Sequence, residues 1–88
     1  MKLKILSADG RHAELECDSV HLNMAADTDG EGEGSVGIRK GHADALIALA
    51  PGGITAYDGG EEIYRARLGR GFASVKQDTV TVETDGIY

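Results

Sequence analysis

The chain has 88 residues, a formal net charge of −6 and a hydrophobic share of 41%. This length holds one small domain with a single core, and it leaves no room inside that core for a deep catalytic cleft. The acidic balance disfavours nucleic acid, whose phosphates it would repel, and no apolar run approaches the roughly 20 residues of a membrane-spanning helix, so we expect no direct membrane insertion.

The first part of the chain alternates polar and apolar residues, which is the period of half-buried strands. Leu3 and Ile5 are expected to face the interior, and Asp9-Gly10 predicts a hairpin turn after them. Cys17, the only cysteine, lies on the apolar phase, which excludes an internal disulfide and favours a buried thiol over a reactive one. The predicted strands are residues 2–5, 13–17 and 20–24.

The middle of the chain is rich in glycine. Residues 25–33 are also acidic, which predicts an exposed loop. In residues 34–43, glycines separate short apolar pieces, and glycines this dense permit positive φ and close backbone approach. We therefore expect this second segment to be a folded-over loop with a bulge that presents a surface, since it carries no cluster of acids, bases or nucleophiles.

The second half of the chain predicts further strands. Residues 45–49 are apolar on both phases, which fits a central strand, and Pro51-Gly52-Gly53 is expected to end it. The other predicted strands are residues 54–57, 62–68, 72–75 and 79–83. Short strands spaced by about ten residues are typical of a β-sandwich. We therefore predict an all-β fold: one domain, residues 1–88, built as a small two-sheet sandwich of about eight to ten strands.

Two motifs resemble ligand sites without the context that such sites need. Residues 32–37 fit the GxGxxG pattern of dinucleotide sites, but β-type sequence follows where a helix is required. Asp27, Asp29 and Glu31 alternate as in a calcium loop, but Ile38 stands at the twelfth position of that loop, where a glutamate is needed. A solvated acidic loop is the favoured interpretation, with a weak divalent-ion site as the alternative.

No pattern of histidines or serines indicates catalysis. The histidines never reach metal-ligand spacing, and His21 is expected on the polar face of a strand. His42 lies between Gly41 and an apolar strand, where a hydrogen bond to the backbone is expected rather than a role as a base. No serine has a pattern that would place it beside a histidine and a carboxylate. We expect a non-catalytic protein with no cofactor and no metal.

Blocks of residues along the chain carry a family resemblance. They are Cys17-Asp18-Ser19-Val20, residues 33–46, Ala50-Pro51-Gly52, Gly71-Phe72-Ala73-Ser74-Val75 and Thr79-Val80-Thr81-Val82. In order and spacing, these blocks resemble the epsilon subunit of F-type ATP synthases, in which an EGE-hydrophobic-GI-x-PGHAPLL block precedes strands of the GGF-x-EV and VTVLA type. The resemblance covers almost the whole chain.

The resemblance implies a β-sandwich domain of the rotary central stalk. Such a subunit docks on the gamma subunit, rests against the membrane-embedded c-ring and helps couple ion flow to ATP synthesis. Carried over by position, the gamma contacts are Ser7, His42 and Ile47. The c-ring contacts are Glu33, Gly34 and Ser35. The implied location is the cytoplasmic face of the bacterial inner membrane, as a peripheral part of the complex.

The sequence departs from the family pattern at several positions. Lys40 and Asp44 stand where the family usually has prolines, and Arg70 replaces the first glycine of the GGF strand. The chain ends at Tyr88, where most members continue into a C-terminal helical hairpin. We therefore expect only the N-terminal sandwich domain. Inhibition of ATP hydrolysis and nucleotide binding, which belong to the hairpin, are not carried over.

A function from another class stays open from the residues alone. The chain could be a free-standing β-sandwich module that binds carbohydrate or calcium through the acidic loop at residues 27–33. The scarcity of aromatic residues, 5% of the chain, counts against stacking on sugar rings. Calcium-dependent melting would favour this alternative, and a stable complex with a gamma-type subunit would exclude it as the main role.

Overall fold

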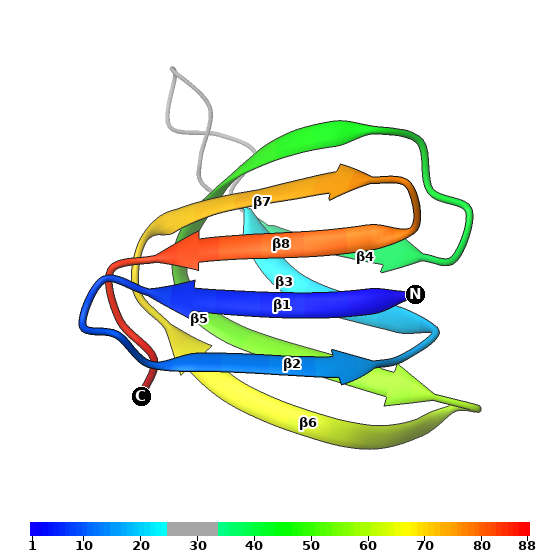
Figure 1. The fold of residues 1–88 in the computed structure, drawn as a ribbon, viewed down its shortest axis with the longest axis horizontal. Coiled ribbons are helices and arrows are strands. Elements are labelled where there is room, and N and C mark those ends of the chain that lie inside the picture. Colours follow the sequence, from blue (N-terminus) through cyan, green and yellow to red (C-terminus); the bar gives the residue numbers. More distant parts are fainter. Residues whose placement is uncertain (25–33) are drawn as a thin grey trace.

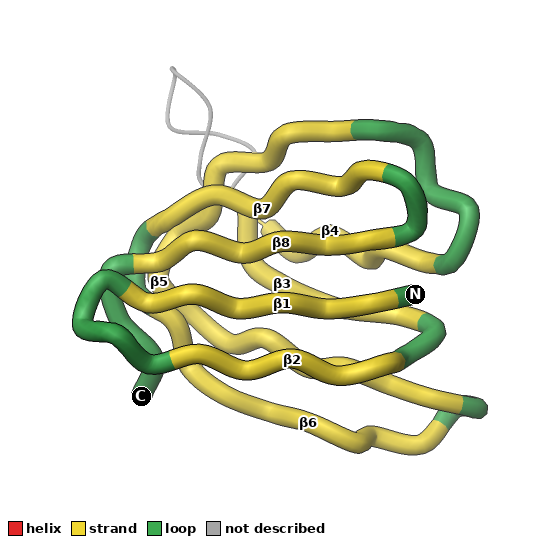
Figure 2. Tube along the Cα trace, in the orientation of Figure 1, coloured by secondary structure: helices red, strands yellow, loops and turns green. Residues whose placement is uncertain are grey.

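The computed structural model describes residues 1–24 and 34–88. Within these residues it contains eight strands and no helix, so the prediction of an all-β fold is confirmed (Figures 1 and 2). The strands are β1 (Lys2–Ser7), β2 (His12–Glu16), β3 (Ser19–Met24), β4 (Gly34–Arg39), β5 (Ala45–Asp58), β6 (Glu61–Leu68), β7 (Gly71–Lys76) and β8 (Thr79–Thr84). A helix long and apolar enough to cross a membrane is not found in the described ranges.

The strands form one mixed sheet that curls into two layers. Its order is β2-β1-β8-β7-β5-β3-β4, and β6 pairs with β5 beside this path. Among the strands of the described residues, β1 and β8 alone pair in parallel. We call β2, β1, β8, β7 and the first part of β5 the front sheet, and β4, β3, the second part of β5 and β6 the back sheet. In Figure 1, β1 and β8 lie in front of β3 and β4, as expected for a sandwich whose core lies between the layers.

Strand β5 belongs to both sheets. Its residues 45–49 pair with β7, and its residues 52–58 pair with β6. The expectation that Pro51-Gly52-Gly53 ends the strand was wrong, because β5 continues without interruption from Ala45 to Asp58. Proline has no N–H to give to a ladder, but Pro51 lies in the gap between the two ladders, where no partner needs one. The proline therefore marks the corner between the sheets rather than a strand end.

Strand β4 replaces the loop that the glycines of residues 34–43 predicted. Gly34–Arg39 pairs along its full length with β3, and in this segment only Gly41, in the turn that follows, has a positive φ, of 81°. Gly37 is needed for space rather than for its φ, since a Cβ there would lie 2.9 Å from Nε2 of His21. The imidazole of His21 lies over Gly37, which explains a glycine inside a strand.

The core is formed by the inward residues that the alternation predicted. Leu3 and Ile5 on β1 are fully buried, and so is Ile54 on β5. The remaining fully buried large side chains are Val20, Leu22, Ile38, Val80 and Val82. Cys17 is 4% exposed, as expected, and burial raises the pKa of its thiol above the ordinary value. Aliphatic packing from both sheets therefore supplies the main stabilisation.

The last residues of the chain close one end of the sandwich. Ile87 forms an isolated bridge with Leu68, and the N–H of Gly69 donates to the carbonyl oxygen of Gly86 at 2.9 Å. Arg11, in the turn before β2, donates from Nη1 to the carbonyl oxygen of Ile87 at 3.1 Å. The tail thereby connects the end of β6 with the turn before β2.

Candidate docking surfaces

Ser7, one of the residues expected at a gamma contact, is the last residue of β1, at one end of the front sheet. It pairs with Thr84 of β8 and is half-buried. Its hydroxyl donates to Oδ1 of Asp9 at 2.6 Å, and the N–H of Arg11 donates to the same oxygen at 3.2 Å. The Ser7 hydroxyl is the main cause that lowers the pKa of the Asp9 carboxyl below its ordinary value, followed by the Arg11 N–H. Ser7 is therefore part of a small polar turn rather than an isolated nucleophile.

His42 and Ile47, the other residues expected at the gamma contact, lie apart from Ser7. The ring of His42 is exposed in the turn before β5, with Nδ1 2.7 Å from the carbonyl oxygen of Ala43, so the predicted backbone hydrogen bond is confirmed. The sheet registers place Leu49 and Ser7 at one end of the front sheet and the His42 turn at the other. Ile47 is half-buried and packs against the core. The structure thus does not gather these residues into one cluster.

The residues expected at the c-ring contact begin strand β4. Gly34 and Ser35 are both exposed and pair with the end of β3. Glu33 lies outside the described residues, and so does the acidic segment 27–33 on which the calcium or carbohydrate alternative depends. These assignments stay predictions.

The described residues bear on the metal and dinucleotide motifs of the sequence. Among residues 1–24 and 34–88, no group of three or more His, Cys, Asp or Glu side chains could hold a metal ion. Residues 34–37 of the GxGxxG match form part of a strand instead of preceding a helix, so the dinucleotide interpretation has no structural support in this part. His21 is exposed on the outer side of β3, as predicted, and contacts the ring of Tyr57 edge-on at a centroid distance of 6.2 Å.

A cluster of exposed apolar side chains that the sequence pattern does not predict lies on the outer face of the front sheet. Leu46 is 73% exposed, Phe72 57% and Leu6 47%. The registers Leu6↔Glu83, Glu83↔Phe72 and Phe72↔Ala48 put Leu6 and Phe72 into one row across four strands, with Glu83 between them. Directly opposed residues of neighbouring strands contact each other on a sheet face, and Leu46 lies diagonally beside Phe72. We call Leu6, Leu46, Phe72 and Glu83 the front patch.

Two shallow hollows flank the Glu83 side chain within the front patch. One, of about 270 Å³, is lined by Leu46, Phe72, Ser74, Thr81 and Glu83. The other, of about 250 Å³, is lined by Leu6, Ser7, Ala8, Glu83 and Thr84. The carboxylate of Glu83 therefore stands between two depressions that have apolar walls. Among the ion pairs of the described residues, none involves Glu83.

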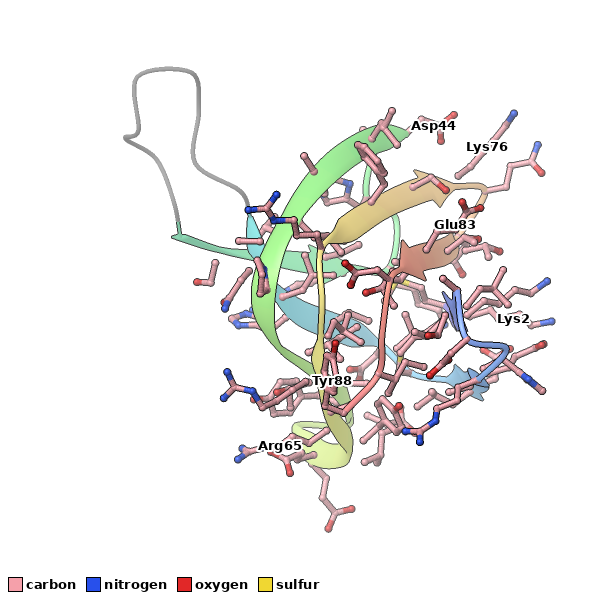
Figure 3. The ribbon with its side chains drawn as sticks, turned by 90° about the vertical axis from the view of Figure 1, so that its left-hand side faces the viewer. Lys2, Asp44, Arg65, Lys76, Glu83 and Tyr88 are labelled. Carbon is pink, nitrogen blue, oxygen red and sulfur yellow. The ribbon has the colours of Figure 1, made fainter. Side chains whose placement is uncertain are left out.

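The outer face of the back sheet is different in character. It presents Arg65 and Arg67 on β6, Thr55 on β5 and His21 on β3. Arg65 pairs with Glu62 at 2.6 Å on the surface. Figure 3 shows the two faces edge-on, with Lys2, Lys76 and Glu83 on one side of the sandwich and Arg65 on the other. Exposed apolar side chains that are gathered on one outer face, as in the front patch, are suited to binding a partner.

Fold and surface together define a small β-sandwich with exposed apolar side chains on one outer face. A family model described as "ATP synthase, Delta/Epsilon chain, beta-sandwich domain" matches residues 1–88. The chain therefore belongs to the delta/epsilon chain family of ATP synthase, and an epsilon-type chain is a non-catalytic part of that complex. The predicted family resemblance is confirmed.

Solved structures agree with this fold. The chain is similar to a chain in the mitochondrial ATP synthase central stalk and c-ring of Tetrahymena thermophila, with 14% identity and a TM-score of 0.71, covering 100% of this chain and 65% of that one. It is also similar to a chain in the OSCP/F1/c-ring structure of the Euglena gracilis mitochondrial ATP synthase, with 21% identity and a TM-score of 0.74. That match covers 98% of this chain and 51% of the other.

These likenesses have defined limits. At such identities the structural matches show the fold alone. The chain spans between about half and two thirds of the length of the two chains it matches. Comparison with curated protein sequences gives no match.

Proposed function

We propose that this chain is a central-stalk rotor subunit of a proton-translocating F-type ATP synthase, where it docks on the gamma subunit and the c-ring and helps couple ion flow to ATP synthesis. The observation that carries the proposal is the family match over the whole of residues 1–88. A sandwich with one shared core is stiff, which suits a part that must transmit rotation without deforming.

The proposed contacts of the chain lie at three places. Ser7 and His42 are accessible at opposite ends of the front sheet, and a broad partner could reach both. Ile47 is half-buried and would contribute from beneath its exposed neighbours on β5. Gly34 and Ser35 at the start of β4, together with Glu33, are proposed to meet the polar loops of the c-ring. An acidic residue there would favour a basic loop and fix orientation more than affinity.

The proposed location is the cytoplasmic face of the bacterial inner membrane. The chain would be held there peripherally, through gamma and the c-ring, because its attachment needs no membrane-inserted segment of its own.

Co-purification tests the proposal. The tagged 88-residue chain is expressed in the cells from which it comes, and complexes are isolated from the membranes in a gentle detergent at low salt. We expect gamma and c subunits to be recovered in fixed stoichiometry. Recovery of the chain alone would contradict the proposal, and calcium-dependent melting of that isolated chain would favour the alternative of a calcium-binding module instead.

A further inference from the structure

A further hollow, of about 410 Å³, lies at the end of the back sheet and shares no residue with the front patch. Its walls come from the start of β3, the end of β4 and the turn between β5 and β6, on the side of the sandwich opposite the C-terminus (Figure 1). We call it the end hollow; its lining residues are Asp18, Ser19, Arg39, Lys40 and Gly60. We propose that the end hollow binds the phosphate group of a small soluble molecule. This site is independent of the proposed function, because it uses none of the residues expected at the stalk contacts.

Asp18 holds the three walls of the end hollow together. Its N–H donates to the carbonyl oxygen of Tyr57 at 2.9 Å, and its carbonyl oxygen accepts from the N–H of Lys40 at 3.2 Å. Its side chain reaches the turn between β5 and β6, where Oδ2 accepts from the N–H of Gly59 at 2.8 Å. The hollow is therefore formed before a ligand arrives, and a preformed site avoids the cost of ordering its walls on binding.

The turn between β5 and β6 gives the end hollow a wall without side chains. Gly59 and Gly60 both have positive φ, of 61° and 82°, as in the tight two-residue turns of β-hairpins. A Cβ on Gly60 would meet nothing within 4 Å, so the space beside its backbone is open. Backbone of this kind can be approached closely by a phosphate group.

Arg39 and Lys40 supply positive charge to the end hollow. Both are exposed, and none of the ion pairs among residues 1–24 and 34–88 involves either of them. Arg39 lies directly opposite Ser19 in the ladder between β3 and β4. Their neighbours Ile38 and Val20 are fully buried, so Arg39 and Ser19 lie together on the outer face. A guanidinium, an ammonium and a hydroxyl group in one hollow are donors suited to phosphate oxygens.

The carboxylate of Asp18 is the one group in this lining that opposes an anion. Two cations outweigh it, so the lining keeps a positive balance. Its Oδ2 already accepts the Gly59 N–H, which fixes the carboxylate toward the turn. Asp18→Asn keeps an acceptor for that N–H and removes the negative charge. We therefore expect this substitution to strengthen phosphate binding, whereas a purely structural role of Asp18 would leave the affinity unchanged or weaken it.

The charge of the whole chain favours a small ligand over an extended one. With a net charge of −6, the chain repels an anionic membrane surface or an acidic polypeptide at long range. A small anion inside the hollow is affected mainly by the charges within roughly 10 Å, because salt screens those further away. A volume of about 410 Å³ has room for a phosphate group and part of the molecule that carries it.

Titration of the 88-residue chain with inorganic phosphate, followed by NMR of the backbone N–H groups, tests the site. Phosphate replaces chloride at constant ionic strength. We expect saturable shifts at Lys40, Gly59 and Gly60, with a Kd of roughly 1–10 mM, as for an open site with few charge-assisted contacts. Asp18→Asn should bind about two- to fivefold more tightly, because one opposing charge is gone.

A pair of double variants isolates the two cations of the end hollow. Arg39→Gln combined with Lys40→Gln should weaken phosphate binding by at least roughly tenfold. The matched control is Arg67→Gln combined with Arg70→Gln, which removes two exposed arginines near the opposite end of β6 and should bind within about twofold of the unchanged chain. Thermal unfolding of each variant confirms that the fold is kept.

Three outcomes would overturn the proposal. Shifts that stay linear with phosphate, or that the Arg39 and Lys40 substitutions leave unchanged, would remove the site. Equal losses in both double variants would reduce the effect to the overall charge of the chain. Binding to phosphatidylglycerol vesicles that only the Arg39 and Lys40 substitutions abolish would contradict a soluble ligand and assign the hollow to lipid headgroups. None of these results bears on recovery of the chain with gamma and c subunits, so the proposed function is tested separately.

Discussion

The outer faces of the two sheets differ although both sheets share one core. The front face carries an apolar row with a single carboxylate, Glu83 between Leu6 and Phe72, whereas the back face carries Arg65, Thr55 and His21 at the corresponding outward positions. Folding needs only the inward residues of each strand, so it does not explain the difference. An outward face is free to be polar, and where it is apolar the reason lies outside the chain's own stability.

The largest expected effect tests whether the core is truly shared by the two sheets. Ile5 on β1 and Ile54 on β5 are both fully buried, one from each sheet. Ile5→Ala and Ile54→Ala should each lower the free energy of unfolding by about 2–5 kcal/mol, because each leaves a cavity in the same packed layer. Urea unfolding measures this. A large loss for only one of them would show that the sheets are stabilised separately.

The next substitution is expected to disrupt the front sheet selectively. A Cβ on Gly71, the first residue of β7, would overlap the backbone carbonyl of Glu83 in β8, whereas a Cβ on Gly53 in the back sheet would meet nothing nearer than 3.9 Å. Gly71→Ala should therefore cost roughly 1–3 kcal/mol by forcing β7 and β8 apart, and Gly53→Ala should cost far less. Denaturant unfolding of the two variants side by side decides this, and equal costs would contradict the close approach at Gly71.

A smaller effect on stability is expected at Gly37 and His21, on the back face. A Cβ on Gly37 would lie 2.9 Å from Nε2 of His21, a side chain that can rotate away. Gly37→Ala should cost about 1 kcal/mol, and much of that cost should vanish when His21→Ala is present as well, because the two positions compete for one space. A double-mutant cycle measures the coupling. Strict additivity would mean that the imidazole does not occupy the position over Gly37.

The smallest effect concerns the turn at the end of the front sheet. The Ser7 hydroxyl and the Arg11 N–H lower the pKa of Asp9, so ionised Asp9 contributes stability that is present above the unfolded pKa and is lost as the pH falls through the folded value. Asp9→Asn keeps an acceptor but cannot titrate. The difference in melting temperature between the two proteins should therefore shrink on acidification below about pH 4. A difference that is constant with pH would contradict this contribution.

The alternation of side chains predicted most strands and the core, because one face of each strand is buried. The two corrections both concern glycine and proline. In the sequence, Gly37 and Pro51 predict interruptions of a strand. In the structure, Gly37 makes room for His21 within β4, and Pro51 lies where β5 changes partner. Those compensations come from residues distant in sequence, so local pattern could not show them.

The front patch could have been anticipated in part. Residues 45–49 are apolar on both phases, which predicts a central strand. Strand β5 is indeed central in the sheet order, but Leu46 points away from the core and is 73% exposed. Leu46, an apolar residue at an outward position of the alternation, was therefore the feature of the sequence that indicated the front patch. Its partners in the patch, Leu6 and Phe72, come from strands whose pairing the sequence alone does not give.

The continuity of β5 has a mechanical consequence. Because one backbone runs from its ladder with β7 to its ladder with β6, a load applied to the front sheet reaches the back sheet along covalent bonds as well as through side-chain packing. Two layers held only by an apolar interior can slide past each other. A strand common to both layers, such as β5, links them covalently across the corner at Pro51. Shear between the layers would have to stretch that strand, so a pull on one face moves the whole body.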